Sequence, residues 1–153
     1  MDRISKEHRS WNMSRIRSGN TKPEIKVRSL LHSMGYRFRL HRKDLPGNPD
    51  IFLPKYKSII FVHGCFWHRH GDCKYAYTPK TRRAFWEKKF SANLERDRIV
   101  QKQLKLKGIK ILVVWECELS EIESVKIRLQ HFLWSEYWQT ILRFIAKIWN
   151  IRE

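Results

Sequence analysis

Two short segments in the first half of the chain carry groups that could bind a hard divalent cation. Asp50 follows Pro49 at a predicted turn, and Phe61-Val62-His63 ends a later apolar run. Pairing of the two runs as antiparallel strands would bring Asp50 and His63 together. A carboxylate and a backbone carbonyl are oxygen ligands that suit Mg²⁺, which keeps its other positions for water and phosphate. Ordinary turn chemistry is the competing interpretation of Pro49-Asp50.

The next segment is rich in cysteine and histidine. Cys65-x4-His70-x2-Cys73 supplies three ligands from one loop, and Cys117 could supply a fourth from far downstream. Sulfur and imidazole ligands favour tetrahedral Zn²⁺, and four protein ligands leave no open position, so the predicted site is structural. The alternative is a set of buried thiols with scattered histidines. The length of loop 63–80, without another source of rigidity, favours the metal.

Three residues inside this loop could take part in catalysis and DNA opening. His68 need not bind zinc, and an imidazole that titrates near neutrality suits a general base that activates water. Phe66 and Trp67 are large aromatic residues that could wedge between base steps. Packing of both rings on the loop or the sheet is the alternative.

The elements that must position these residues alternate between helices and strands. Thr21 is a candidate N-cap with Glu24 three residues on, as in a capping box. The predicted order is a helix to Gly35, strands over 36–41, 51–53 and 58–62, a basic helix from near Thr81 to Gly108, a strand over 109–115, and a helix carrying Ile122, Val125, Leu129, Phe132 and Leu133. This order predicts an α/β sandwich around a mixed sheet.

Three finer expectations concern single elements. Loop 63–80 is predicted to lack regular structure. In the basic helix, Trp86, Phe90 and Leu94 follow i+4 spacing and are expected to face the core. The nearly continuous apolar run 109–115 is typical of a central buried strand.

The composition favours a polyanionic partner. Thirty-two Lys and Arg against 15 Asp and Glu give a net charge of +17, and nucleic acid is the first partner to consider. A solubility charge or a basic ribosome-associated protein is the alternative. The chain lacks an apolar run long enough to span a membrane and a secretory signal, and its three cysteines do not suggest a disulfide framework. We therefore expect a cytoplasmic protein, associated with the nucleoid when active.

The organisation follows from composition along the chain. Residues 1–20 are polar and basic, which predicts a flexible arm that contacts DNA. Residues 21–135 form the predicted main domain with its zinc-bound loop, and residues 136–153 form a tail rich in aromatic residues.

Several motifs occur together in one order. The most specific is Phe61-Val62-His63-Gly64-Cys65-Phe66-Trp67-His68. The others, within residues 8–118, are Asn12-Met13 with Thr21-x2-Glu24, Leu45-Pro46-Gly47-x-Pro49-Asp50, Asn93-x-Glu95-Arg96-Asp97 and Val114-Trp115-Glu116-Cys117. This combination resembles the very short patch repair (Vsr) DNA mismatch endonuclease family.

The resemblance implies that residues 21–135 are an endonuclease domain, with a fold related to restriction endonucleases and one catalytic centre. It implies two Mg²⁺ ions, held by Asp50 and by the backbone carbonyl of Val62. It implies His68 as the general base, His63 as a contact to the scissile phosphate, and Glu24 as a carboxylate that supports the centre through metal-bound water. It also implies that Cys65, His70, Cys73 and Cys117 are the zinc ligands.

On the DNA side, the resemblance implies that Phe66 and Trp67 open the duplex from one groove and that Met13 enters from the other. Lys89 and Asn93 lie where the family contacts the mismatch. The implied product is a nick 5′ to the thymine of a T·G mismatch left by deamination of 5-methylcytosine. Double-stranded DNA with this mismatch is the expected partner, and a mismatch-repair scaffold protein is a second candidate.

Two positions depart from the family pattern. Loop 68–73 is about one residue longer than the histidine-rich version, so the ligand inside it could shift. Val62 stands where threonine is common, a change that a backbone carbonyl ligand tolerates. Two other functions compete: a restriction- or homing-type nuclease that cuts a specific sequence without a mismatch, and a non-enzymatic basic zinc module.

Overall fold

A four-stranded mixed sheet forms the centre of the computed structural model, which describes residues 5–15 and 19–134. The strands are β1 (Arg39–Leu40), β2 (Ile51–Leu53), β3 (Ser58–His63) and β4 (Lys110–Trp115), in the order β1-β2-β3-β4. The β1–β2 and β2–β3 pairs are antiparallel, whereas β4 runs parallel to β3. The 3₁₀ turn η1 (Pro54–Tyr56) joins β2 to β3, so the predicted hairpin is confirmed. The tail 136–153 lies outside the described residues.

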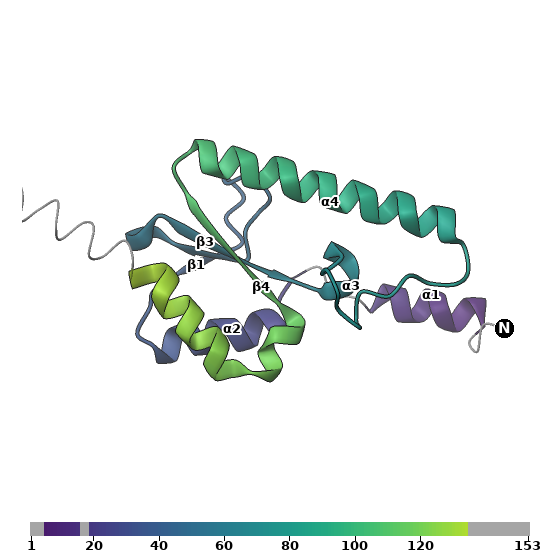
Figure 1. The fold of residues 1–153 in the computed structure, drawn as a ribbon, viewed down its shortest axis with the longest axis horizontal. Coiled ribbons are helices and arrows are strands. Elements are labelled where there is room, and N and C mark those ends of the chain that lie inside the picture. The colour runs from purple at the N-terminus through teal and green to yellow at the C-terminus, as the bar shows by residue number, and fades with distance from the viewer. Residues whose placement is uncertain (1–4, 16–18, 135–153) are drawn as a thin grey trace, which may run out of the picture.

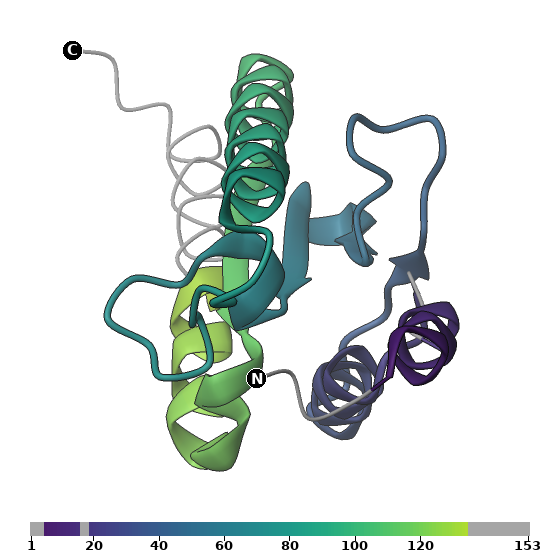
Figure 2. The same cartoon turned by 90° about the vertical axis from the view of Figure 1, so that its right-hand side faces the viewer.

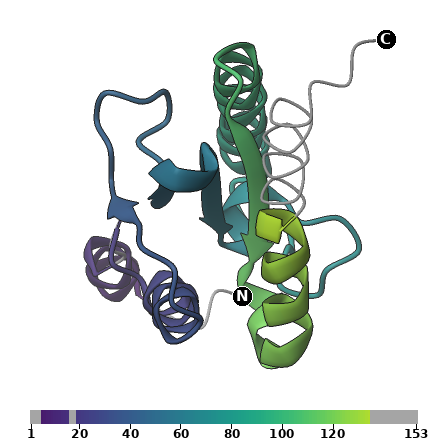
Figure 3. The same cartoon turned by 90° about the vertical axis from the view of Figure 1, so that its left-hand side faces the viewer.

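Helices cover both faces of the sheet (Figure 1). The long helix α4 (Arg83–Leu106) lies over one face, and α2 (Lys22–Ser33) and a helix over residues 122–134 lie over the other (Figures 1 and 3). Alternate residues of β3 serve the two layers, because Ile59 packs with α4 and Ile60 packs with α2 and the last helix. The predicted α/β sandwich is confirmed.

The position of β4 differs from the prediction. Among the described strands, β4 lies at the edge of the sheet, and β3 lies inside it. A parallel pair needs a long crossover, which α4 provides between β3 and β4. The run 109–115 is apolar because both of its faces are covered: Val113 packs on the α4 side and Val114 on the side of α2. Burial on two faces, rather than a central position, explains the pattern.

The first strand is shorter than predicted. Only Arg39 and Leu40 pair with β2, although the alternating pattern suggests a strand over 36–41. Tyr36 and Phe38 instead pack into the core that α2 and the last helix share. Aromatic residues that alternate can therefore mark core packing as well as sheet pairing.

The start and end of α2 follow the predicted signals. Thr21 Oγ1 accepts a hydrogen bond from the backbone N–H of Glu24, and Gly35 ends the helix with a φ of +81°. The Glu24 carboxylate reaches back to the N–H of Asn20, one residue before the cap. The cap therefore fixes the position of Glu24 as well as the beginning of the helix.

Two short helices occur where the sequence predicts irregular chain. The predicted flexible arm contains α1 (Lys6–Ser14), whose first turn is capped by Ser5 Oγ accepting from the N–H of His8. Loop 63–80 contains α3 (Cys65–His68), which ends at Arg69 in a left-handed conformation. Within the described residues, no helix is long and apolar enough to cross a membrane.

The loop between β1 and β2 stands beside α4 on the same side of the sheet (Figures 2 and 3). Gly47 in this loop has a φ of +76°, and a Cβ atom there would lie 2.5 Å from Val100 Cγ1 of α4. Glycine is therefore required both by the backbone conformation and by the close approach. This contact makes the loop one wall of the site described next.

Candidate active site and metal centre

A cleft of about 1110 Å³ opens between α4, the loop after β1 and the start of α2. It lies over the carboxyl end of β3, so the short α3 helix forms part of its floor. The predicted site residues that line it are Glu24, Asp50, Val62, His63, Trp67, His68, Lys89 and Asn93. The structure therefore brings together the residues that the sequence assigns to catalysis and mismatch contact.

Asp50 lies immediately before β2 and lines this cleft. Its Oδ2 accepts a hydrogen bond from the N–H of Val62 at 2.8 Å, which fixes the carboxylate against β3. Burial raises the pKa of Asp50 to about 6, although the bond from Val62 acts in the opposite direction. A buried carboxylate of this kind gains from a cation beside it.

Glu24 and His41 complete a cluster around Asp50. Each of the three offers one ligand atom, and these atoms lie within 4.8 Å of one another. Glu24 is almost fully buried, and it accepts hydrogen bonds from Asn20 and from Thr21 Oγ1, each at 2.9 Å. Two carboxylates in one polar cleft suit a hard divalent cation. His41 belongs to no motif of the sequence, and its backbone is left-handed, with a φ of +45°.

His68 forms the centre of a second cluster. Its Nδ1 lies 2.5 Å from Asp97 Oδ2, and its ring stacks on His63 with 3.8 Å between centroids. Burial lowers the pKa of His63 to about 4, and the nearby His68 acts in the same direction. Burial alone would raise the pKa of Asp97, but the hydrogen bond and the charge of His68 hold it below its usual value. Asp97 is thus a carboxylate that orients His68.

Sequence reasoning missed the role of Asp97 because it misplaced the inner face of α4. Leu94 is 46% exposed and faces solvent, so its predicted core position is wrong. The face toward the sheet carries Phe90, Asn93, Asp97 and Leu104, at successive spacings of three, four and seven residues. Two of these are polar because the middle of this face borders the cleft rather than the core. The Asn93–Asp97 spacing was the available signal.

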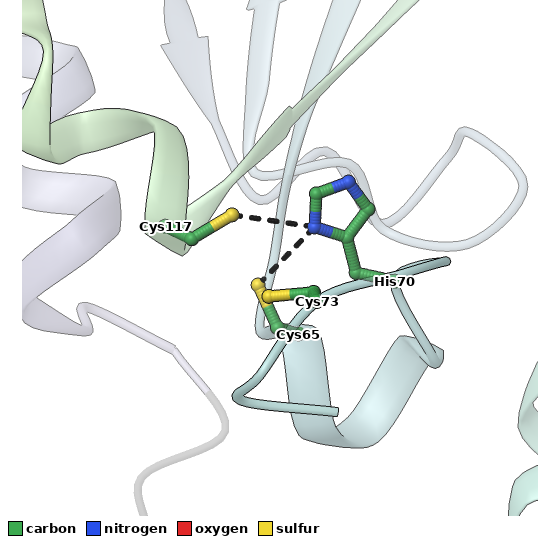
Figure 4. Close-up of side chains that lie close together, drawn as sticks. All are labelled: Cys65, His70, Cys73 and Cys117. Atoms are coloured by element: carbon green, nitrogen blue, oxygen red, sulfur yellow. Dashed lines mark hydrogen bonds between the residues drawn. The ribbon is translucent and has the colours of Figure 1, made fainter. Parts of the chain in front are cut away.

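The four predicted zinc ligands lie together at the ends of β3 and β4 (Figure 4). His70 Nδ1 is 3.6 Å from Cys65 Sγ and 3.2 Å from Cys117 Sγ, and all four ligand atoms, with Cys73, lie within 4.8 Å of one another. The S–N edge of a tetrahedral zinc site is about 3.6 Å, given ordinary Zn–S and Zn–N bond lengths. Since β3 and β4 are parallel, their carboxyl ends meet, and this places Cys117 (in η2, Glu116–Ser120) beside α3.

The donor set fits a structural zinc ion. Burial raises the pKa of the Cys65 thiol to about 12 and also raises that of Cys117. A cation at this position would favour the thiolates. His70 stacks on Trp115, with ring centroids 4.2 Å apart, and this contact holds its Nδ1 toward the sulfurs. The longer loop therefore does not move the histidine out of the group.

The aromatic residues of α3 have different surroundings. Phe66 packs against the rings of Trp67, Tyr77, Trp86 and Phe90, with centroids 5.0 to 5.3 Å apart. Trp67, by contrast, lines the cleft. The packing alternative therefore describes Phe66 well in the free protein.

The remaining predicted DNA contacts lie on α4 and α1. Asn93 is buried, and its Nδ2 donates to the carbonyl of Trp67 at 3.1 Å, so it also supports α3. Lys89 is exposed at the cleft. Met13 lies in α1, and its contact with DNA stays a prediction.

Known proteins are similar to this chain in sequence and in fold. The family described as DNA mismatch endonuclease Vsr matches residues 1–75. The type II nicking enzyme V.XorIIP of Xanthomonas oryzae pv. oryzae is 52% identical over 132 residues, which cover 86% of this chain and 96% of that enzyme. The DNA mismatch endonuclease Vsr of Escherichia coli is 43% identical over 78% of this chain and 76% of its own length.

The fold has a counterpart among solved structures. The catalytic domain of the homing endonuclease I-Bth0305I aligns with a TM-score of 0.55 and 25% identity, over 76% of this chain and 98% of that domain. This likeness confirms the restriction-endonuclease-like fold. With 43% identity to the DNA mismatch endonuclease Vsr over 76% of that enzyme's length, the chain belongs to the Vsr family and is a DNA endonuclease.

Proposed function

We propose that this endonuclease nicks duplex DNA 5′ to the thymine of a T·G mismatch, by Mg²⁺-dependent hydrolysis of one phosphodiester. The observation that carries the proposal is the cleft itself. It holds a carboxylate centre around Asp50 and a histidine–carboxylate pair, His68 and Asp97, side by side.

Asp50 and the backbone carbonyl of Val62 would hold the Mg²⁺ ions, and Glu24 would support them. When bound, Mg²⁺ neutralises the phosphate and the charge that develops on it during cleavage. The chain prepares the site by fixing Asp50 through the N–H of Val62 and by burying Glu24 under the cap of α2.

His68 is the proposed general base. Because Asp97 accepts a hydrogen bond at Nδ1, the proton of His68 lies on that nitrogen and Nε2 is free to accept one. A water molecule at Nε2 would lose its proton there as it attacks phosphorus, and the P–O bond to the ester oxygen opposite the water would break, so that this oxygen leaves. The ring of His63 stacks on the ring of His68 and limits the rotation of His68. The neutral imidazole of His63 can donate one hydrogen bond to the scissile phosphate.

Mismatch recognition would use the aromatic residues of α3 with the arm. Trp67 at the cleft, Phe66 behind it and Met13 of α1 are the proposed wedges, with Lys89 and Asn93 near the mismatched bases. Opening a mismatch costs less than opening a paired step, which gives selectivity. Trp67→Ala should therefore weaken discrimination between mismatched and paired duplexes more than it weakens general DNA binding. Equal losses on both duplexes would argue against intercalation.

Zinc is proposed as a structural ion held by Cys65, His70, Cys73 and Cys117, and a mismatch-repair scaffold protein stays a predicted partner. A second candidate function is nicking at a specific sequence without a mismatch. The names of two similar proteins, a type II nicking enzyme and a homing endonuclease catalytic domain, favour it. Membership of an endonuclease family excludes the non-enzymatic zinc module.

The deciding experiment compares two labelled duplexes that differ only in one T·G versus one C·G pair. A single Mg²⁺-dependent nick 5′ to the thymine, in the mismatched duplex alone, would establish the proposed function. Equal cutting of both duplexes would establish the second candidate, and cutting of neither would exclude both. Asp50→Asn serves as the inactive control.

A further inference from the structure

Arg28 of α2 lies beside the proposed metal centre, and no step of the proposed reaction uses it. One terminal nitrogen, Nη2, donates to Glu24 Oε2 at 2.5 Å and lies 3.0 Å from His41 Nε2. The other, Nη1, donates to Asn20 Oδ1 at 2.6 Å. The guanidinium therefore joins the segment before α2, α2 itself and the loop after β1.

The direction of these bonds fixes where the positive charge lies. A guanidinium only donates hydrogen bonds, so Nε2 of His41 must be the acceptor in this contact, and that nitrogen carries no proton. The cation in contact with Glu24 is thus Arg28, whose charge is permanent at any working pH.

The pair is shielded from solvent. The side chains of Arg28 and Glu24 are only 12% and 4% exposed, so salt and water screen their interaction weakly. Two of the residues around them, Asn20 and His41, adopt left-handed backbone conformations, with φ values of 56° and 45°. Strained backbone that surrounding contacts maintain is a common feature of functional sites.

We propose that Arg28 is a positioning residue of the nicking reaction. Its guanidinium holds the Glu24 carboxylate in place and offsets its charge, so that a divalent cation at Asp50 meets one uncompensated carboxylate instead of two. This inference rests on the proposed metal-dependent function. It predicts that loss of Arg28 strengthens metal binding and slows nicking. Loss of a purely structural residue would weaken both.

The test measures Mn²⁺ binding and nicking separately in Arg28→Met, which removes the charge but keeps much of the volume. Mn²⁺ binding to zinc-loaded, DNA-free protein is followed by the electron paramagnetic resonance of free Mn²⁺. Without Arg28 the centre is more negative, so Mn²⁺ should bind about tenfold more tightly. By contrast, the single-turnover nicking rate at saturating Mg²⁺ should be about tenfold lower, because Glu24 is no longer held.

Two further variants separate charge from geometry. Arg28→Lys keeps the charge but cannot donate to three groups at once, so its Mn²⁺ affinity should stay within about twofold of wild type while its nicking rate recovers only in part. Lys126→Met removes one positive charge from an exposed Lys126–Glu123 pair outside the cleft and should change neither quantity.

Several results would overturn the inference. Weaker Mn²⁺ binding together with slower nicking in Arg28→Met would show a structural role only, and no change in either would show no role. Mn²⁺ binding to Asp50→Asn gives the background level, because this variant lacks the proposed cation site. Should Asp50→Asn bind Mn²⁺ as tightly as wild type, the metal assignment would fail and the inference with it. If wild type binds Mn²⁺ more tightly than Asp50→Asn does, but Arg28→Met binds Mn²⁺ and nicks DNA like wild type, the metal assignment stands and only the inference about Arg28 fails.

Discussion

The hydrogen bond between His68 and Asp97 determines which nitrogen of His68 can act as a base. Asp97→Asn keeps the shape of the side chain but removes the charge and allows the amide to present N–H to Nδ1. We expect the single-turnover nicking rate to fall about a hundredfold with DNA binding retained, as for loss of an oriented general base.

Glu95→Gln is the matched control for this prediction. Glu95 lies two residues away on α4 but pairs with Arg98 on the exposed surface. It should nick at the wild-type rate. A rate for Asp97→Asn within about twofold of wild type would remove Asp97 from the catalytic centre.

Asp50 should make the metal-free protein less stable at neutral pH. Its pKa is raised to about 6 in the folded protein, so the folded state holds the proton more tightly than the unfolded state does. The free energy of unfolding therefore decreases as pH rises from about 4 to about 6, and the cost reaches up to about 3 kcal/mol above that range.

Asp50→Asn tests this cost by urea denaturation in buffer without Mg²⁺. The amide oxygen can still accept from the N–H of Val62, so the variant should be more stable than wild type at neutral pH. The difference should shrink toward about pH 5. With saturating Mg²⁺ the wild type should regain stability and the variant should not. A variant less stable than wild type in Mg²⁺-free buffer would contradict this prediction.

Among the elements, α4 shows what the sequence could predict and what it could not. Its extent, its basic outer surface and the burial of Phe90 follow from composition and spacing. Its inner face could not be found from apolar residues alone, because Asn93 and Asp97 border the cleft there. Hydrophobic periodicity fails where a helix faces a site instead of a core.

Two leucines of α4 give a direct test of this face. Leu104 is fully buried under β3, whereas Leu94 is about half exposed. Leu104→Ala should lower the free energy of unfolding by about 2–5 kcal/mol, and Leu94→Ala by less than about 0.5 kcal/mol. Similar losses in urea denaturation would restore the Trp86–Phe90–Leu94 stripe as the inner face.

The same contrast applies to the sheet and the loops. The β2–β3 hairpin could be predicted because a turn separates two apolar runs, and its register places Asp50 beside Val62. The parallel β3–β4 pair could not be predicted from local pattern, since α4 separates the two strands in the chain. His41 joins the site only through the tertiary contact of its loop with α2, whereas Arg28 pairs with Glu24 at i,i+4 spacing within α2; neither residue carries a motif.

For the molecule as a whole, the cysteine–histidine cluster links parts that the sheet alone leaves separate. Cys65 lies in α3 beyond β3, His70 and Cys73 lie in the following loop, and Cys117 lies in η2 beyond β4. Its ion would therefore fix α3, which carries both Trp67 and His68, to the end of β4. A hydrogen bond from the N–H of Cys65 to Glu116 Oε1 supports the same junction.

Removal of one zinc ligand should thus affect stability and catalysis together. Cys73→Ser leaves three ligands, and metal binding is coupled to folding, so we expect less than one zinc per chain and a melting temperature at least about 10 °C lower. Nicking should fall in parallel with zinc content, since His68 loses its support. Cys73→His offers a replacement nitrogen ligand and should recover much of both. A Cys73→Ser protein with one zinc per chain and the wild-type melting temperature would show that Cys73 is not a ligand, and that the loop is held by its packing alone.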